Sequence, residues 1–273
     1  MKIYGLDFTS NPGLKKSITC AQCWLDDDVL SLESSIHITS FDEFEQFLRQ
    51  PGPWITGMDF PFGQPRKLIE NIGWPQTWEG YVRYLSILSK PEFISIIEEY
   101  RKGRKYGDKL HRRITDVRAK SQSPMMLDYT PVGKMFFEGT HRLLGAGVSI
   151  LPSCRRDDPR IVVEAYPALV ARWAKAGSYK SDDVKRQTLA KQSAREEIVR
   201  KLQSKEIKAA YGFDVHFSDK YAEDFVRDGT GDELDALLCA VQAGWAYSQR
   251  DANYGIPADC DPLEGWIVDP LLL

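Results

Sequence analysis

Apolar runs bounded by turn residues indicate three strands within the first forty positions of the chain. The runs cover Lys2–Phe8, Ser17–Leu25 and Val29–Ile38. Asn11-Pro12-Gly13 follows the first run, and the acidic turn Asp26-Asp27-Asp28 separates the other two. A turn this short predicts that the second and third strands form an antiparallel hairpin.

A short helix and a fourth strand follow the hairpin. Ser40-Phe41-Asp42-Glu43 has the pattern of a capping box, in which serine and glutamate satisfy backbone N–H groups at the start of a helix. Pro51-Gly52-Pro53 ends this helix and leads into an apolar strand from Trp54 to Asp59. Because a helix joins the strands on either side of it, we expect the new strand to form a parallel pair within the sheet.

The pattern Gly-x-Asp-Phe occurs twice, each time where a predicted strand ends. Gly5-Leu6-Asp7-Phe8 closes the first strand, and Gly57-Met58-Asp59-Phe60 closes the fourth. A single aspartate in this position often only caps the following loop. The repetition favours a second interpretation, in which the two strands are neighbours and the carboxylates of Asp7 and Asp59 converge.

The middle of the chain predicts helices and loops. Residues 77–89 and 91–101 carry apolar residues at helical spacing. Residues 123–147 are rich in loop-forming glycine and proline, with one short helix expected around Lys134–Leu144. We therefore expect a helical insertion over roughly residues 64–147.

The second half of the chain predicts one buried strand and several helices. Arg160–Tyr166 is the strand, with Glu164 near its end, and Pro167 begins a helix at a position where proline is tolerated. The further elements that we expect are a long mixed-charge helix at 182–203, a helix with small residues that packs closely on the sheet at 231–248, and a final strand at 264–269.

Composition and charge describe a globular protein. The 273 residues are 42% hydrophobic and 11% aromatic, which suffices for a large core and excludes a disordered chain. A net charge of -3 provides no overall attraction to nucleic acid. No apolar run reaches the roughly 18 residues of a membrane span. The N-terminal residues look like a strand and not like a signal peptide, so we expect a cytoplasmic protein without a membrane partner.

The five cysteines do not indicate a disulfide framework, because their number is odd. Cys20 and Cys23 form an isolated Cys-x-x-Cys, whereas a zinc site needs a second pair of ligands. Residues three apart in a strand point to opposite faces of the sheet. These two thiols are therefore not expected to share a metal.

Residues 101–120 are strongly basic, with nine lysines or arginines against two aspartates. One interpretation is a solvated face of a helix or loop, as most runs of charge are. The other is an arm that contacts phosphates and draws a polyanion towards acidic residues that repel it. On the second interpretation Arg112, Arg113 and Lys120 are candidate nucleic-acid-binding residues.

Five acidic residues occupy positions that suit a divalent-metal site. Asp7, Asp59 and Glu164 lie at strand ends, and Asp232 and Asp235 lie in the first turn of the helix at 231–248. Hard cations such as Mg²⁺ and Mn²⁺ prefer oxygen ligands, and two of them roughly 4 Å apart stabilise the attacking and leaving oxygens of a phosphoryl transfer. Asp232 has an alternative role as helix cap. All five are candidate catalytic residues, and Asp7, Asp59 and Asp235 are the expected metal ligands.

Four short segments carry a resemblance to a known family: GLDF at 5–8, GMDFPFG at 57–63, VVEAYP at 162–167 and GDELDALLCAVQAGWA at 231–246. Together they resemble the domain of unknown function 429 family over nearly the whole chain. The resemblance implies a ribonuclease H fold, a nuclease-like activity, and a site made of Asp7, Asp59, Glu164 and Asp235. It also implies an arginine and an aspartate from the middle of the chain, for which Arg113 and Asp116 are the best match.

These observations predict one α/β domain of ribonuclease H type over residues 1–273, with a mixed sheet, helices on both faces and the helical insertion. The predicted activity is hydrolysis of phosphodiester bonds in nucleic acid with Mg²⁺ or Mn²⁺ as cofactor. One alternative is an actin-like nucleotide phosphotransferase, because repeated Gly-x-Asp strand ends also suit two phosphate loops. The other is a catalytically silent nucleic-acid-binding or scaffold protein. That alternative gains support if the acids do not meet, or if they pair with lysine or arginine in place of metal.

Overall fold

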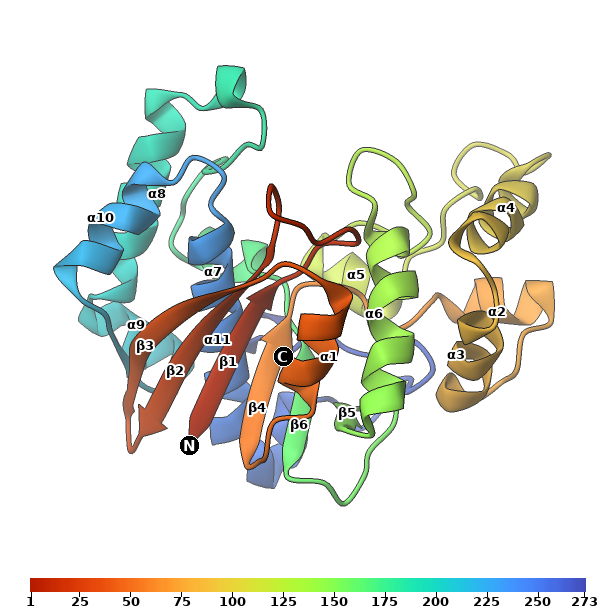
Figure 1. Cartoon of the computed structure of the whole chain (residues 1–273), viewed down its shortest axis with the longest axis horizontal. Coiled ribbons are helices and arrows are strands. Elements are labelled where there is room, and N and C mark those ends of the chain that lie inside the picture. The colour runs from red at the N-terminus through yellow and green to blue at the C-terminus, as the bar shows by residue number, and fades with distance from the viewer.

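One seven-stranded sheet forms the centre of the computed structural model, which describes residues 1–273 (Figure 1). The strands follow one another across the sheet in the order β5-β6-β4-β1-β2-β3-β7. Their bounds are β1 Lys2–Asp7, β2 Ile18–Asp26, β3 Val29–Ile38, β4 Trp54–Met58, β5 Ser149–Leu151, β6 Arg160–Glu164 and β7 Asp214–His216.

The sheet is mixed because only β2 runs against its neighbours. It pairs antiparallel with β1 and with β3, so the predicted hairpin of β2 and β3 is confirmed. Every other neighbouring pair is parallel, including β1 with β4 and β4 with β6. The expected parallel strand after the first helix is therefore also confirmed. The carboxyl ends of β1, β4 and β6 consequently lie at one edge of the sheet.

Helices cover both faces of the sheet and enclose two hydrophobic cores. Tyr4 and Leu6 of β1 belong to one core and Ile3 to the other, as the alternation of side chains along a strand requires. The first core contains α1 Phe41–Leu48, α2 Arg66–Ile72, α3 Trp78–Ser86, α4 Lys90–Arg101 and α6 Val132–Ala146. The second contains α7 Ala168–Trp173, α8 Leu189–Leu202, α9 Lys205–Tyr211, α10 Asp219–Arg227 and α11 Asp232–Ser248. Figure 1 shows α1 in front of the sheet and α11 behind it.

The insertion at 64–147 is helical, as expected. Helices α3, α4 and α6 form close to the predicted positions, whereas α2 and the short α5 Ile114–Ala119 were not predicted. Thr77 and Ser89 cap α3 and α4 with their side chains, which explains where these helices begin. The buried side chains of α3, α4 and α6 complete a core with those of β1 and β4, so the insertion packs directly onto the sheet.

Two predictions for the second half of the chain are wrong in detail. The long helix expected at 182–203 is divided into the 3₁₀ turn η1 Val184–Arg186 and α8, because the Thr188 side chain accepts from Lys191 N–H and starts a new helix. The strand expected at 264–269 is a single parallel bridge between Ile267 and Glu164, followed by the 3₁₀ turn η3 Pro270–Leu272. The strand beside β3 at the edge of the sheet is β7, which was not predicted.

Two smaller expectations agree with the structure. Cys20 and Cys23 of β2 lie in different cores on opposite faces of the sheet, so they do not share a site. None of the helices combines the length and the apolar character that crossing a bilayer requires.

Candidate metal centre

Three of the five candidate acids meet where β1 and β4 end. Asp7 is the last residue of β1, and Asp59 directly follows β4, which is the parallel neighbour of β1. Asp235 reaches the same point from the first turn of α11. One carboxylate oxygen from each of the three residues lies within 4.8 Å of the other two. The predicted convergence of Asp7 and Asp59 is confirmed, and Asp235 completes the cluster.

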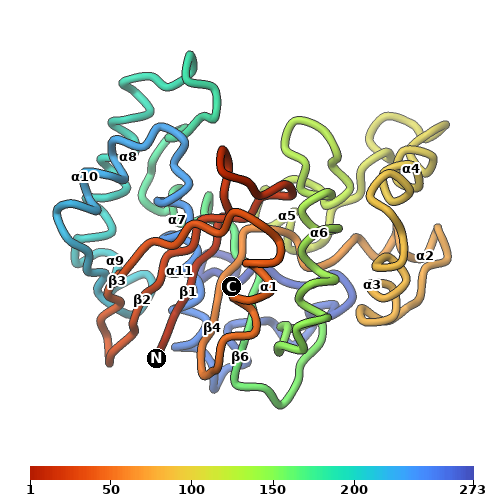
Figure 2. The backbone as a smooth tube through the Cα atoms, viewed as in Figure 1, coloured from red at the N-terminus to blue at the C-terminus, as the bar shows by residue number.

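Two glycines allow α11 to approach the sheet closely enough to bring Asp235 into the cluster. Gly5 of β1 and Gly57 of β4 lie opposite each other in register. A Cβ atom at Gly5 would lie 2.0 Å from the carbonyl oxygen of Ala236, and one at Gly57 would lie 2.5 Å from that of Cys239. A side chain at either position would push α11 away from the sheet. In each Gly-x-Asp-Phe motif, the glycine therefore positions α11 and the aspartate contributes a carboxylate. Figure 1 and Figure 2 show β1 and α11, from opposite ends of the sequence, side by side.

Lys180 and Tyr179 hold the carboxylate of Asp235. Both lie in the segment between α7 and η1. The Lys180 ammonium forms an ion pair with Asp235 Oδ2, and the Tyr179 hydroxyl donates to Asp235 Oδ1 at 2.5 Å. Asp235 is fully buried, whereas the Lys180 side chain is 40% exposed. The ammonium therefore lies at the boundary between the cluster and solvent.

Helix α8 fixes the backbone that carries Lys180. The buried Arg195 of α8 donates to the carbonyl oxygen of Tyr179 at 2.6 Å. Lys191, one turn earlier, donates to the carbonyl oxygen of Lys180 at 2.9 Å. Lys180 is therefore a positioned component of the site. Neither Lys180 nor Tyr179 was singled out from the sequence, since a Tyr-Lys pair in a polar loop carries no distinctive pattern.

Burial makes the charged forms of these carboxylates costly. It raises the pKa of Asp59 to about 7, although Lys180 opposes the shift. It also raises the pKa of Asp7 well above its ordinary range, and that of Asp235 despite the contacts with Lys180 and Tyr179. When all are ionised, the three carboxylates and one ammonium carry a net charge of -2. One divalent cation neutralises that charge.

Asp232 lies outside the cluster. Its carboxylate pairs with Lys16 at 2.9 Å, and the same ammonium contacts Asp182 at 3.0 Å. It does not cap α11 either, because the capping position belongs to Gly231, which has a φ of 75°. Asp232 is therefore neither the cap nor the additional metal ligand that its position suggested.

Glu164 pairs with Arg113 and not with the aspartates. All five N–H groups of Arg113 are used: Nη1 and Nη2 reach the two Glu164 oxygens at 2.8 and 2.6 Å. Nε and Nη2 reach Asp116 at 2.9 and 2.7 Å, and Nη1 also reaches the carbonyl of Glu264 at 2.9 Å. The backbone N–H of Phe62 donates to Glu164 at 2.9 Å. Arg113 of the middle-chain pair therefore contacts the candidate acid Glu164. Together with Asp116, these residues form a buried ion-pair network.

The basic segment 101–120 does not act as one surface. Arg113 is 1% exposed and has no N–H left for a phosphate, so its expected contact with nucleic acid does not fit this geometry. Arg112 and Lys120 are exposed, and Lys120 follows α5 in the left-handed conformation, with a φ of 51°. These two residues are available to a polyanion.

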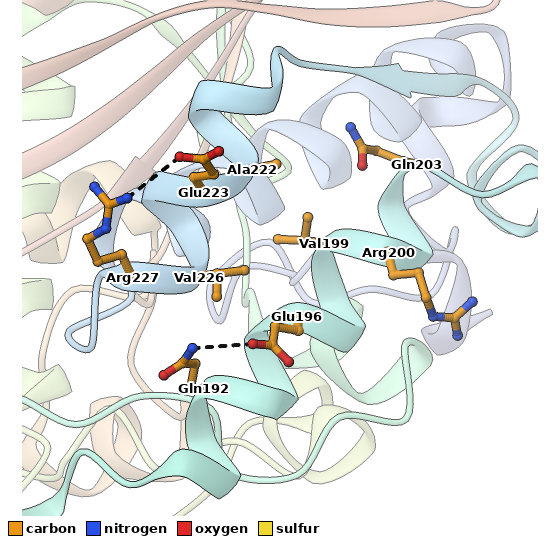
Figure 3. Close-up of a pocket in the computed structure, with 9 residues that line it drawn as sticks. All are labelled: Gln192, Glu196, Val199, Arg200, Gln203, Ala222, Glu223, Val226 and Arg227. Carbon is orange, nitrogen blue, oxygen red and sulfur yellow. Dashed lines mark hydrogen bonds and ion pairs between the residues drawn. The ribbon is translucent and has the colours of Figure 1, made fainter.

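A recess of about 330 Å³ opens beside the cluster. Asp59, Lys180, Glu164 and Arg113 are among the residues that line it. A larger cavity of about 620 Å³ lies between α8 and α10, as Figure 3 shows. Its wall contains none of the candidate site acids, and two pairs of its polar side chains contact each other: Glu223 with Arg227 at 3.6 Å, and Gln192 with Glu196 at 3.3 Å. The chemistry of the site therefore points to the smaller recess.

Comparison of the chain with models of protein families, with curated proteins and with solved structures found no match.

Proposed function

We propose that the protein is a divalent-metal-dependent nuclease that hydrolyses phosphodiester bonds. The observation that carries the proposal is the approach of Asp7, Asp59 and Asp235, whose carboxylate oxygens lie within 4.8 Å of one another. Three carboxylates at this spacing form the oxygen donor set that Mg²⁺ and Mn²⁺ prefer. The net charge of -2 supports a divalent ligand further.

Asp7, Asp59 and Asp235 would hold the metal. A metal bound there supplies a Lewis acid and activates water for attack on phosphorus. Asp59 is the partly exposed member of the three, so its carboxylate faces incoming substrate. The 40% exposed Lys180 ammonium is positioned to contact a phosphate oxygen beside the cluster. Arg112 and Lys120 are the basic residues that we assign to longer-range attraction of a polyanion.

We also propose that the α/β fold is of ribonuclease H type. The mixed sheet, the helices on both faces and the acids at the ends of adjacent parallel strands agree with what the family resemblance implies. Fold alone does not establish chemistry, so the activity depends on the carboxylates.

The ion pair between Lys180 and Asp235 favours a second candidate, a catalytically silent nucleic-acid-binding protein of the same fold. In that protein the ammonium would replace the metal permanently. The candidates differ in the state of the other two carboxylates, because one ammonium compensates only one of three. In a silent protein those two would be protonated, as the raised pKa values of Asp7 and Asp59 allow, whereas in the nuclease a metal would hold them ionised.

Two substitutions on the same turn of α11 test the proposal. Asp235→Asn keeps the shape of the side chain and removes a hard ligand, whereas the matched control Asp232→Asn changes an acid outside the cluster. Calorimetric titration with Mn²⁺ and cleavage of single- and double-stranded oligonucleotides are measured for each. We expect metal binding and cleavage in the wild type and in Asp232→Asn, and neither in Asp235→Asn. Wild-type protein that binds no Mn²⁺, or Asp235→Asn protein that cleaves at the wild-type rate, would refute the nuclease assignment.

A further inference from the structure

The recess beside the cluster has two chemically different ends. Asp59 and Lys180 are partly exposed lining residues, and we call their end of the recess its mouth. Arg113, Asp116 and Glu164 are buried lining residues, and we call their end its floor. The two ends place different demands on a ligand, and together they describe its chemistry.

The floor cannot bind a phosphate. The five N–H groups of Arg113 all donate to protein oxygens, so none is free for a ligand. Arg113, Asp116 and Glu164 carry a net charge of -1, which repels an anion. The anionic part of a ligand therefore lies at the mouth, against Lys180 and a metal held by the aspartates. The part that enters the recess must be uncharged.

The walls suit a planar group that also has polar edges. Eight of the 18 lining residues are hydrophobic, among them Phe60, Val132, Met135, Tyr166, Ala168 and Ile267. Arg172 holds the Tyr166 ring, since its guanidinium lies 5.4 Å from the ring centroid and donates to the hydroxyl at 3.3 Å. Gln122 and Thr130 are exposed at the rim, where an amide and a hydroxyl can bond to a ligand. A heterocyclic base has both the planar face and the hydrogen-bonding edge that these walls require.

We propose that this recess is a nucleoside pocket, which receives the sugar and base of one nucleotide while its phosphate lies at Asp59 and Lys180. The volume of about 330 Å³ falls at the small end of the roughly 300–1000 Å³ of ligand pockets. This volume suits one nucleoside and is too small for two paired nucleosides with their sugars. The substrate is consequently a free nucleotide, a strand end or an unpaired nucleotide, and not the interior of a continuous duplex. This substrate class rests on the proposed nuclease function.

Binding of mononucleotides tests the pocket separately from cleavage. Adenosine 5′-monophosphate and thymidine 5′-monophosphate are titrated calorimetrically into the wild-type protein with Mn²⁺ present, and inorganic phosphate serves as the ligand without a nucleoside. We expect the nucleotides to bind roughly tenfold more tightly than phosphate, since a stacked base adds affinity of this order. Phosphate that binds as tightly as either nucleotide would overturn the pocket. Absence of Mn²⁺ binding would instead overturn the metal site, and the same titration without metal would still decide the pocket.

The second measurement is nucleotide binding by a variant in which a larger side chain fills the recess. Ala168→Phe places a ring inside the recess, and Ala258→Phe adds the same ring at an exposed position that does not line it. We expect Ala168→Phe to lose nucleotide binding and keep the wild-type Mn²⁺ affinity, and Ala258→Phe to keep both. If Ala168→Phe does not fold, Tyr166→Leu removes the aromatic wall and should weaken nucleotide binding at unchanged Mn²⁺ affinity. Wild-type nucleotide affinity in the folded variant overturns the proposal.

Competition distinguishes the sources of the nucleotide. A fluorescent mononucleotide is displaced with single-stranded oligonucleotide, with unlabelled mononucleotide or with covalently closed duplex DNA. Displacement by the oligonucleotide supports a strand end or an unpaired nucleotide, and displacement by the mononucleotide alone supports a small nucleotide substrate. Closed duplex that competes as well as single strand would overturn the assignment to one unpaired nucleoside.

Discussion

Replacing Lys180 with methionine tests whether its ammonium and the proposed metal compete for the three carboxylates. The substitution removes the ammonium and keeps an unbranched side chain of similar length. In metal-free protein at pH 8, above the pKa of about 7 of Asp59, the cluster then loses its one internal counter-charge. We expect the metal-free variant to be less stable than the wild type and to bind Mn²⁺ more tightly.

The magnitude follows from the geometry of the Lys180–Asp235 pair. Removing one partner of a buried ion pair costs about 3–5 kcal/mol. Asp235 is fully buried but Lys180 is 40% exposed, so solvent screening puts the expected loss near the lower end of that range. In a chain of this size, each kcal/mol lost from the free energy of unfolding lowers the melting temperature by about 2–4 °C. The melting temperature of the variant should therefore fall by roughly 6–12 °C. To bind a metal, the wild type must break the ion pair between Lys180 and Asp235. Lys180→Met has no such pair to break, so it should bind Mn²⁺ up to roughly 100-fold more tightly.

The assay is a thermal melt of wild type and Lys180→Met in chelator and in millimolar Mn²⁺, together with calorimetric titration of the metal. The matched control is Lys185→Met, which alters an exposed lysine in the adjacent turn η1. Mn²⁺ should restore the melting temperature of Lys180→Met towards that of the wild type, because the metal replaces the lost cation. The control should follow the wild type under both conditions.

Equal metal-free stability and equal Mn²⁺ affinity in the wild type and Lys180→Met would refute the reasoning. That result would mean that the ammonium makes no net electrostatic contribution to the cluster. Lower stability without tighter metal binding would mean that Lys180 is structural and does not compete with a metal.

Three further predictions concern other parts of the molecule. Gly57→Ala should destabilise the fold by about 1–3 kcal/mol and weaken Mn²⁺ binding, because the added Cβ displaces α11. The control Gly145→Ala should do neither, because its Cβ meets nothing within 4 Å. Denaturant melts and metal titrations check both variants. Mn²⁺ affinity should rise with pH through about pH 7, since Asp59 must lose its proton to bind metal, and should not level off there because burial also raises the pKa of Asp7 well above its ordinary range. Titrations between pH 5.5 and 8.5 check this, and Asp59→Asn should remove the part of the rise near pH 7. Replacing Arg112 and Lys120 with alanine should weaken binding of single-stranded oligonucleotide and flatten its salt dependence, as measured by fluorescence anisotropy across a salt series.

Strands and helices with strong local signals were predictable from the sequence. The hairpin of β2 and β3, the parallel return of β4 and the apolar stripe of α11 all have periodicity or turn residues that identify them. The short strands β5 and β7, of three residues each, have no such signal, because so few residues show no period. The break between η1 and α8 was missed because the charged residues on both sides continue a helical pattern, and only the cap at Thr188 interrupts it.

The cluster of three aspartates was predictable because a repeated motif marked two of them, and a helix with a small-residue face carried the third. The partners of the remaining acids were not predictable. Lys16 meets Asp232, and Arg113 meets Glu164, across sequence separations of 216 and 51 residues. Charge pairing over such distances depends on the finished tertiary structure. Local composition could identify Arg113 only as one cation in a basic run.

The ion-pair network of Arg113 also sets an order for assembling the protein. Its five donors find their acceptors in residues 116, 164 and 264, the last of them 151 positions further along the chain. The guanidinium has its full set of acceptors only when the C-terminal segment has docked, and closing a loop of this length carries an entropic cost. Until then the floor of the recess contains a charge without its full set of partners. The helical insertion, β6 and the C-terminal segment are thus linked through one side chain, and we expect these three parts of the chain to open together.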